Sequence, residues 1–127
     1  MCDEKTTIND DIVLVGRSDA GWDNIHDGID IDKILNKSDL SKYVIVLDHQ
    51  PVDYEENSQY GADLEISGHT HGGQVFPYLI FLKFYNSLVY GEYHFGNMEH
   101  IVSSGLTGWG WPMRNEAKCE YVLININ

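Results

Sequence analysis

The sequence predicts an α/β domain whose sheet is mixed in its first half and built from antiparallel hairpins in its second half. Two uninterrupted apolar runs, at 12–16 and 43–47, and a third predicted strand at 62–66 alternate with polar segments. Such continuous runs are typical of parallel strands that are buried on both faces. After residue 90 the apolar residues alternate with polar ones, which is typical of antiparallel strands with one solvated face. With 127 residues, 43% of them hydrophobic, the chain can form one domain with a modest core.

The expected elements follow from these patterns in chain order. We expect residues 1–10 to be a polar N-terminal segment that precedes a domain spanning 11–127. Helices are predicted at 29–40 and 52–60, and strands at 12–16, 43–47, 62–66, 90–95, 99–104 and 120–126. The aromatic-rich stretch 76–90 contains Pro77 and Lys83 and is too interrupted for a membrane span. Its first interpretation is core or a buried loop against the missing half of the protein, and a lid, a membrane-facing loop or an interfacial helix is the alternative.

The charge balance excludes several classes of function. The chain has 20 acidic residues against 8 Lys plus Arg, a net charge of −12 with neutral histidines. A nucleic-acid surface needs a basic face, so no nucleic-acid partner is expected, and electrostatic docking on anionic lipid is disfavoured. The first ten residues lack the pattern of a signal peptide, so we expect the chain as given to be soluble. Cys2 and Cys119 lie at opposite ends, and two unpaired thiols are expected rather than one disulfide.

Two of the predicted strands run directly into loops that contain histidine. His49 follows the strand at 43–47, and His69 and His71 follow the strand at 62–66. The carboxyl ends of parallel strands lie at one edge of a sheet, so the three histidines would converge if these strands are parallel neighbours. Neutral imidazole is the commonest metal ligand in proteins. The sequence therefore predicts a divalent-metal site at His49, His69 and His71.

The second loop carries its histidines between glycines. His69 and His71 are separated by one residue, so both side chains can point to one place only if the backbone turns tightly. Gly68, Gly72 and Gly73 permit the positive φ angles that such a turn requires. We expect these glycines to shape the loop.

Other polar residues near these segments have two interpretations each. Asp48 could orient the ring of His49 as a hydrogen-bond acceptor, or it could cap the end of the strand. His94 and His100 fall in the predicted hairpin strands, where we expect surface or interstrand histidines rather than ligands.

Two segments together resemble the last two metal motifs of the calcineurin-like metallophosphoesterases. They are LDHQP at 47–51 and SGHTHGGQ at 67–74. LVGRSD at 14–19 and VSSGL at 102–106 are also similar to this family, in the bacterial branch that includes membrane-anchored members. The resemblance covers roughly residues 11 to 126. It implies that the chain is the C-terminal half of a two-sheet sandwich flanked by helices.

The resemblance also implies a chemistry and roles for particular residues. The family hydrolyses phosphomonoesters or phosphodiesters at two adjacent divalent metals (Mn, Fe, Zn or Co), which activate a bridging water. By the family pattern, His49 and His69 would bind one metal and His71 the other, while Thr70 and Gly68 shape the turn. Arg114 would lie near the substrate, and a surface salt bridge is the alternative for it.

The family's upstream metal motifs have no counterpart in the sequence. These are an Asp-x-His, a Gly-Asp-x-x-Asp and a Gly-Asn-His-Asp/Glu, whereas residues 1–48 contain a single histidine, His26, outside any such pattern. We therefore expect the C-terminal portion of a longer enzyme. Three histidines shared by two metals leave each metal short of ligands, so weak binding of one metal and negligible phosphoesterase activity are expected for the chain alone. Uncovered sheet surface should favour self-association or pairing with the missing N-terminal half.

Two further functions remain open on the sequence alone. The chain could be a non-catalytic assembly or regulatory module that keeps the fold, as the absent upstream ligands suggest. It could also be a hydrolase in which all three histidines hold one zinc ion with an open fourth position. Because the related branch includes membrane-anchored proteins, a membrane location of the full-length protein stays open as well.

Overall fold

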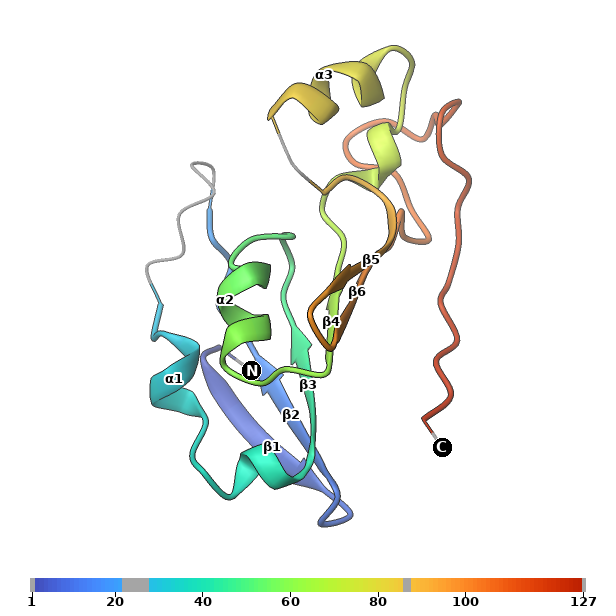
Figure 1. Cartoon of the computed structure of the whole chain (residues 1–127). Coiled ribbons are helices and arrows are strands. Elements are labelled where there is room, and N and C mark those ends of the chain that lie inside the picture. The colour runs from blue at the N-terminus through green and yellow to red at the C-terminus, as the bar shows by residue number, and fades with distance from the viewer. Residues whose placement is uncertain (1, 22–27, 86–87, 127) are drawn as a thin grey trace.

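The computed structural model describes residues 2–21, 28–85 and 88–126, and their strands form one mixed six-stranded sheet (Figure 1). The strand order is β1-β2-β3-β4-β6-β5. The strands are β1 (Glu4–Ile8), β2 (Ile12–Gly16), β3 (Tyr43–Leu47), β4 (Leu64–Ser67), β5 (Gly91–Phe95) and β6 (Met98–Val102). The four central strands are parallel, and each edge strand pairs antiparallel with its neighbour. The predicted mixed α/β fold is therefore confirmed.

Five short helical segments connect the strands. The α-helices are α1 (Ile31–Ile34), α2 (Tyr54–Gln59) and α3 (Tyr78–Tyr85), and the 3-10 helices span Asp39–Ser41 and His71–Gly73. The helix predicted at 29–40 is shorter than expected, because the Asn36 side chain accepts from the backbone N–H of Ser38 and Asp39. Local side-chain bonds of this kind compete with the helical hydrogen bonds.

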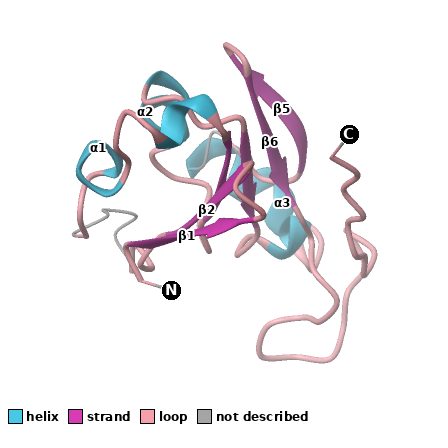
Figure 2. Cartoon of the chain, turned by 90° about the horizontal axis from the view of Figure 1, so that it is seen from below, coloured by secondary structure: helices cyan, strands magenta, loops and turns pink. Residues whose placement is uncertain are grey.

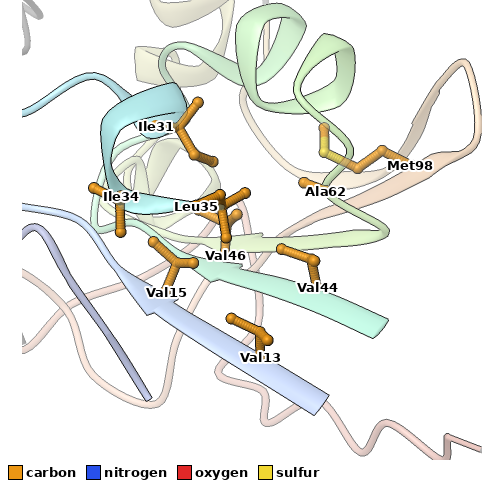
Figure 3. Close-up of a cluster of buried hydrophobic side chains, with 9 residues drawn as sticks. All are labelled: Val13, Val15, Ile31, Ile34, Leu35, Val44, Val46, Ala62 and Met98. Carbon is orange, nitrogen blue, oxygen red and sulfur yellow. The ribbon is translucent and has the colours of Figure 1, made fainter. Parts of the chain in front are cut away.

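The hydrophobic core lies between the sheet and the helices α1 and α2, which cover the same face (Figures 1 and 2). The parallel register places Val13 opposite Val44 and Val15 opposite Val46, so all four side chains point to this face. Figure 3 shows them packed beneath α1 together with Ala62 and Met98.

The opposite face of the sheet is also apolar. The residues that alternate with the core residues along β2, β3, β4 and β6 point to it. They are Ile12, Leu14, Ile45, Leu47, Leu64, Ile66 and Ile101. Along this row Leu47 is 38% exposed, whereas Ile45 and Leu64 are buried. This apolar row, called the open face below, explains why the parallel strands have continuous apolar sequences.

The polar N-terminal segment contributes to the sheet. Residues Glu4–Ile8 form β1 and pair antiparallel with β2, from Glu4 opposite Gly16 to Ile8 opposite Ile12. The sequence pattern missed this strand because an edge strand buries little and can consist of polar residues. Its side chains are mostly exposed.

One prediction for the second half of the chain is wrong within the described residues. Residues 120–126 form no strand, and Tyr121 and Leu123 are 81% and 77% exposed, so their alternation serves no buried face. In the stretch 76–90, Leu88 and Val89 are buried, whereas none of the residues of the helix α3 is buried within this chain, and its burial against further protein stays a prediction. Its Phe84 is 82% exposed.

Three smaller observations complete the fold. Among the described residues, none of the helices has the length and apolar composition that crossing a bilayer would require. Cys2 and Cys119 are exposed and unpaired, as expected. His26 lies outside the described residues.

Candidate metal centre

The loops that follow β2, β3 and β4 meet at one edge of the sheet because these strands are parallel neighbours. Backbone hydrogen bonds continue across the loops. The N–H of Arg17 donates to the carbonyl of Leu47 at 2.9 Å, and the N–H of Gly68 donates to the carbonyl of His49 at 3.1 Å. The histidine-bearing loops are therefore held side by side just beyond the last residues of the sheet.

His49 and His69 are brought together at this edge. Nδ1 of His69 lies 3.1 Å from Nε2 of His49, and the ring centroids are 4.9 Å apart with the rings nearly perpendicular. Partial burial, with the adjacent His49, lowers the pKa of His69 below its usual value. The neutral ring of His69, the form that binds metal ions, is therefore favoured.

His71 lies in the same turn but its ring is oriented toward another loop. Its Nδ1 donates to the backbone carbonyl of Thr107 at 3.1 Å. Within the described ranges 2–21, 28–85 and 88–126, no group of three or more His, Cys, Asp or Glu side chains is arranged to hold a metal ion. The structure thus gathers two of the three predicted ligands and holds the third apart.

The turn that carries His69 and His71 has an unusual backbone. Positive φ angles occur at His69 (65°), His71 (50°), Gly72 (58°), Gly73 (87°) and Gln74 (46°). Left-handed conformations of non-glycine residues are sparsely populated and tend to cluster at functional sites. Two of the glycines expected to permit positive φ do adopt it, whereas Gly68 is not among the residues with positive φ.

Thr70 fastens the turn from inside. It is buried, and its hydroxyl donates to the carbonyl of Val89 and accepts from the N–H of Gly72 at 3.4 Å. A Cβ on Gly72 would lie 2.4 Å from the Cβ of Ala117, so the close packing of these two segments requires glycine.

The other two predicted residues, Asp48 and Arg114, lie beside the turn and form hydrogen bonds with backbone groups. Asp48 is buried, and its Oδ1 accepts from the backbone N–H of Gln50 at 3.1 Å, which is the strand-end capping arrangement. Arg114 lies behind the turn, where its guanidinium donates to backbone carbonyls, including that of His71 at 3.0 Å. Among the described residues, no ion pair of Arg114 with a carboxylate is observed, so the alternative of a surface salt bridge is not found.

His94 and His100 lie on the strands of the hairpin, as expected. His94 is exposed on β5. His100 is fully buried on β6, where its Nε2 lies 2.8 Å from the hydroxyl of Ser67 and 3.7 Å from Oε1 of Glu65. Burial lowers the pKa of His100 to about 4 and raises that of Glu65 to about 8.

Sequence reasoning missed three residues near the site. Asp19 follows β2 at the same edge and accepts from Nε2 of Gln50 at 2.9 Å; its position after a predicted strand was the available signal. Gln74 donates from Nε2 to the carbonyls of Trp109 and Trp111 at 3.0 and 3.2 Å. Thr107 contributes only its backbone carbonyl, which no sequence pattern reveals.

Comparison with known proteins gives a consistent set of relatives. A Helicobacter pylori (strain J99) protein named "Uncharacterized metallophosphoesterase" is 40% identical over 99 residues, which are 76% of this chain and 27% of that protein. The Campylobacter jejuni "Uncharacterized metallophosphoesterase Cj0846" is 37% identical over 91% of this chain and 31% of its own length. A zebrafish (Danio rerio) "Transmembrane protein with metallophosphoesterase domain" is 33% identical over 76% of this chain and 23% of its own length.

The chain therefore spans about a quarter to a third of the length of these relatives. No protein-family model matches the chain, and no solved structure matches it.

Proposed function

We propose that the chain supplies the histidine side of a dinuclear site that hydrolyses phosphomonoesters or phosphodiesters. The chain is a homologue of the metallophosphoesterases, and its match is consistent with the C-terminal portion of such a protein. A bound divalent metal supplies Lewis acidity toward phosphoryl oxygen and lowers the pKa of a bound water. The roles of the chain's own residues follow from the geometry of the turn.

The observation that carries the proposal is the pair of imidazole nitrogens 3.1 Å apart on His49 and His69. Two nitrogens that bind the same metal ion at about 2.1 Å are about 3.0 Å apart when the N–metal–N angle is a right angle. They are about 3.4 Å apart when that angle is tetrahedral. The observed separation falls within this range. The pair therefore fits two ligands of one ion of Mn, Fe, Zn or Co, all of which accept imidazole nitrogen.

His71 is the proposed ligand of the second ion. The neutral ring donates through Nδ1 to Thr107, so its other nitrogen, Nε2, keeps a lone pair for a metal. Such orientation of a ligand ring by a backbone carbonyl is common in metal sites.

A complete site requires more ligands than these histidines. Divalent ions of this kind take four to six ligands. We propose that the chain by itself binds one ion weakly and has negligible phosphoesterase activity, because nothing holds two ions at a fixed separation.

The open face supports a proposal about partners. Its apolar row along β2, β3, β4 and β6 needs a cover in water, which the remaining part of a longer protein or a second copy of this chain would provide. Because the zebrafish relative is named a transmembrane protein, we also propose that the full-length protein is associated with a membrane.

A metal titration tests the proposed site. We expect calorimetric titration with Mn²⁺ or Zn²⁺ to show one weak binding event for the chain. His69→Ala should lose at least about tenfold in affinity, as removing one of two ligands predicts. The matched control is His94→Ala, an exposed histidine on β5. Equal affinities of the parent and His69→Ala would contradict the proposal.

An activity measurement separates the partial site from a complete one. With excess Mn²⁺ and a chromogenic phosphodiester, we expect no turnover by the chain. Turnover that disappears in His69→Ala would show that these residues build a working centre by themselves, as a three-histidine hydrolase would, and would overturn the expectation of additional ligands.

A further inference from the structure

We propose that Arg114 is a positioning residue for His71: its guanidinium holds the loop 104–117 against the histidine turn and, through the carbonyl of Thr107, fixes the orientation of the His71 ring. The proposal rests on the proposed function, in which Nε2 of His71 binds a metal. It assigns Arg114 to the ligand's support instead of to the substrate.

Every donor of the Arg114 guanidinium is used by the backbone. A guanidinium has five N–H groups, one on Nε and two on each Nη nitrogen. Nε donates to Ala117 at 3.2 Å, Nη1 to Gly105 at 3.1 Å and Thr107 at 3.0 Å, and Nη2 to His71 and Ser104 at 3.0 Å each. Five carbonyl oxygens thus accept from the guanidinium, and Nη1 also lies 3.8 Å from Sγ of Cys119, a weak acceptor.

This saturation decides between the two sequence interpretations of Arg114. A phosphate clamp needs two parallel N–H groups facing the ligand, and a salt bridge needs a carboxylate. The five carbonyls leave no N–H group for a bidentate contact with phosphate. The positive charge instead faces a ring of carbonyl dipoles that come from two segments far apart in the sequence.

The carbonyl of Thr107 connects Arg114 to the ring of His71. It accepts from Nη1 of Arg114 at 3.0 Å and from Nδ1 of His71 at 3.1 Å, which uses both lone pairs of the oxygen. Arg114 also holds the main chain of the same histidine through the 3.0 Å bond to its carbonyl. Backbone and ring of His71 are therefore fixed by one side chain.

The backbone of the turn explains why such support is needed. His71 and Gln74 adopt positive φ without being glycine, which is unfavourable unless the surroundings hold the conformation. Gln74 adds a second tie to the same loop, because its Oε1 accepts from the N–H of Trp109 at 2.6 Å. The loop 104–117 thus packs against the turn and stabilises its backbone conformation.

The first test needs no substitution. Long-range ¹H–¹⁵N NMR spectra of the ¹⁵N-labelled chain report which ring nitrogen of each histidine carries the proton. We expect the Nδ1–H tautomer for His71 at neutral pH. The Nε2–H tautomer would overturn the proposal, because the ring would then not donate to Thr107.

The second test compares Arg114→Lys, Lys118→Ala and His71→Ala with the parent. Arg114→Lys keeps the charge but places all its donors on one flexible nitrogen, so it cannot reproduce the five-carbonyl arrangement. Zn²⁺ titration followed at the ring signals of His71 should show an affinity lower by about 10- to 100-fold, the usual effect of removing support behind a ligand. His71 should also show mixed tautomers in this variant. Lys118→Ala, which removes a nearby charge of the same sign, is the control and should behave as the parent.

The outcomes separate this inference from the function on which it rests. If the His71 signals of the parent do not respond to Zn²⁺ while those of His49 and His69 do, His71 is not a ligand, and both its proposed role and the inference are overturned. If His71 responds in the parent and responds equally well in Arg114→Lys, with an unchanged tautomer, the proposed function stands and the positioning role of Arg114 is wrong. His71→Ala gives the affinity expected for complete loss of the ligand.

Discussion

Glu65 and His100 form a buried titratable pair that should control how the stability of the chain varies with pH. They are opposite each other on β4 and β6, and both side chains are fully buried. Asn57 donates to Oε2 of Glu65 at 2.9 Å, and Nε2 of His100 lies 2.8 Å from the hydroxyl of Ser67. Although Nε2 of His100 lies 3.7 Å from Oε1 of Glu65, burial is the largest cause of both pKa shifts and favours the neutral form of each group near pH 7.

The pKa of Glu65 rises from 4.5 to about 8, first because of burial; the carboxylates of Asp48 and Asp53 also raise it, whereas the hydrogen bond from Asn57 and the charge of Arg17 lower it. A raised pKa stabilises the fold fully below pH 4.5, and this contribution is lost as the pH rises through 8. The pKa of His100 falls from 6.5 to about 4, so its contribution is present above pH 6.5 and is lost as the pH falls through 4.

These opposite shifts define one pH window for a clean measurement. Between pH 4.5 and 6.5 the two contributions change in opposite directions and largely cancel. Between pH 6.5 and 8 the titration of Glu65 dominates, because the pKa values of His100 and His69 are lowered in the fold and only the remaining protons of their unfolded forms oppose it. At about 1.4 kcal/mol for each pH unit, the contribution of Glu65 to the free energy of unfolding should fall by about 2 kcal/mol across this window.

The substitution Glu65→Gln removes the titration and keeps an oxygen that can accept from Asn57. We expect urea unfolding at pH 6.5 and 8 to show the decrease of about 2 kcal/mol in the parent and little change in Glu65→Gln. Glu99→Gln, which alters an exposed carboxylate on β6, should keep the pH dependence of the parent. If the parent and Glu65→Gln lose the same free energy between these pH values, the argument from burial is refuted.

Two further predictions concern the turn and the open face. Gly72→Ala should lower the free energy of unfolding by at least about 1–2 kcal/mol, because Gly72 has a positive φ and a Cβ there would clash with Ala117. Gly68→Ala should change the free energy of unfolding little, because a Cβ at Gly68 makes only an ordinary contact. Equal unfolding midpoints in urea for the two variants would contradict this. In sedimentation velocity we expect the chain to associate as its concentration increases. Leu47→Lys should shift the equilibrium toward monomer, because Leu47 lies on the open face. A parent chain that stays monomeric at high concentration would argue against self-association.

The sequence by itself determined the centre of the sheet. The apolar runs at 12–16 and 43–47 coincide with β2 and β3, because strands buried on both faces must be apolar at every position. The same reasoning placed His49 and His69 at one edge, since the carboxyl ends of parallel neighbours meet there. These features depend on local composition and on the direction of the strands.

The sequence did not reveal the edges of the fold. The strand β1 is polar because an edge strand buries little, and residues 120–126 alternate without pairing in any strand of the described part of the chain. Alternation indicates a half-buried surface, but whether a partner strand is present depends on the rest of the structure. The exposure of α3 is a fact of the same kind, because an apolar segment carries no information about what covers it.

The support of the histidine turn is visible only in the folded structure. His71 has its ring on the carbonyl of Thr107, 36 residues away, and Arg114 binds five carbonyls in place of a carboxylate or a phosphate. Histidine and arginine can be recognised in a sequence because their side chains differ from all others. A backbone carbonyl is the same at every residue, so the fold alone determines which carbonyls these side chains meet.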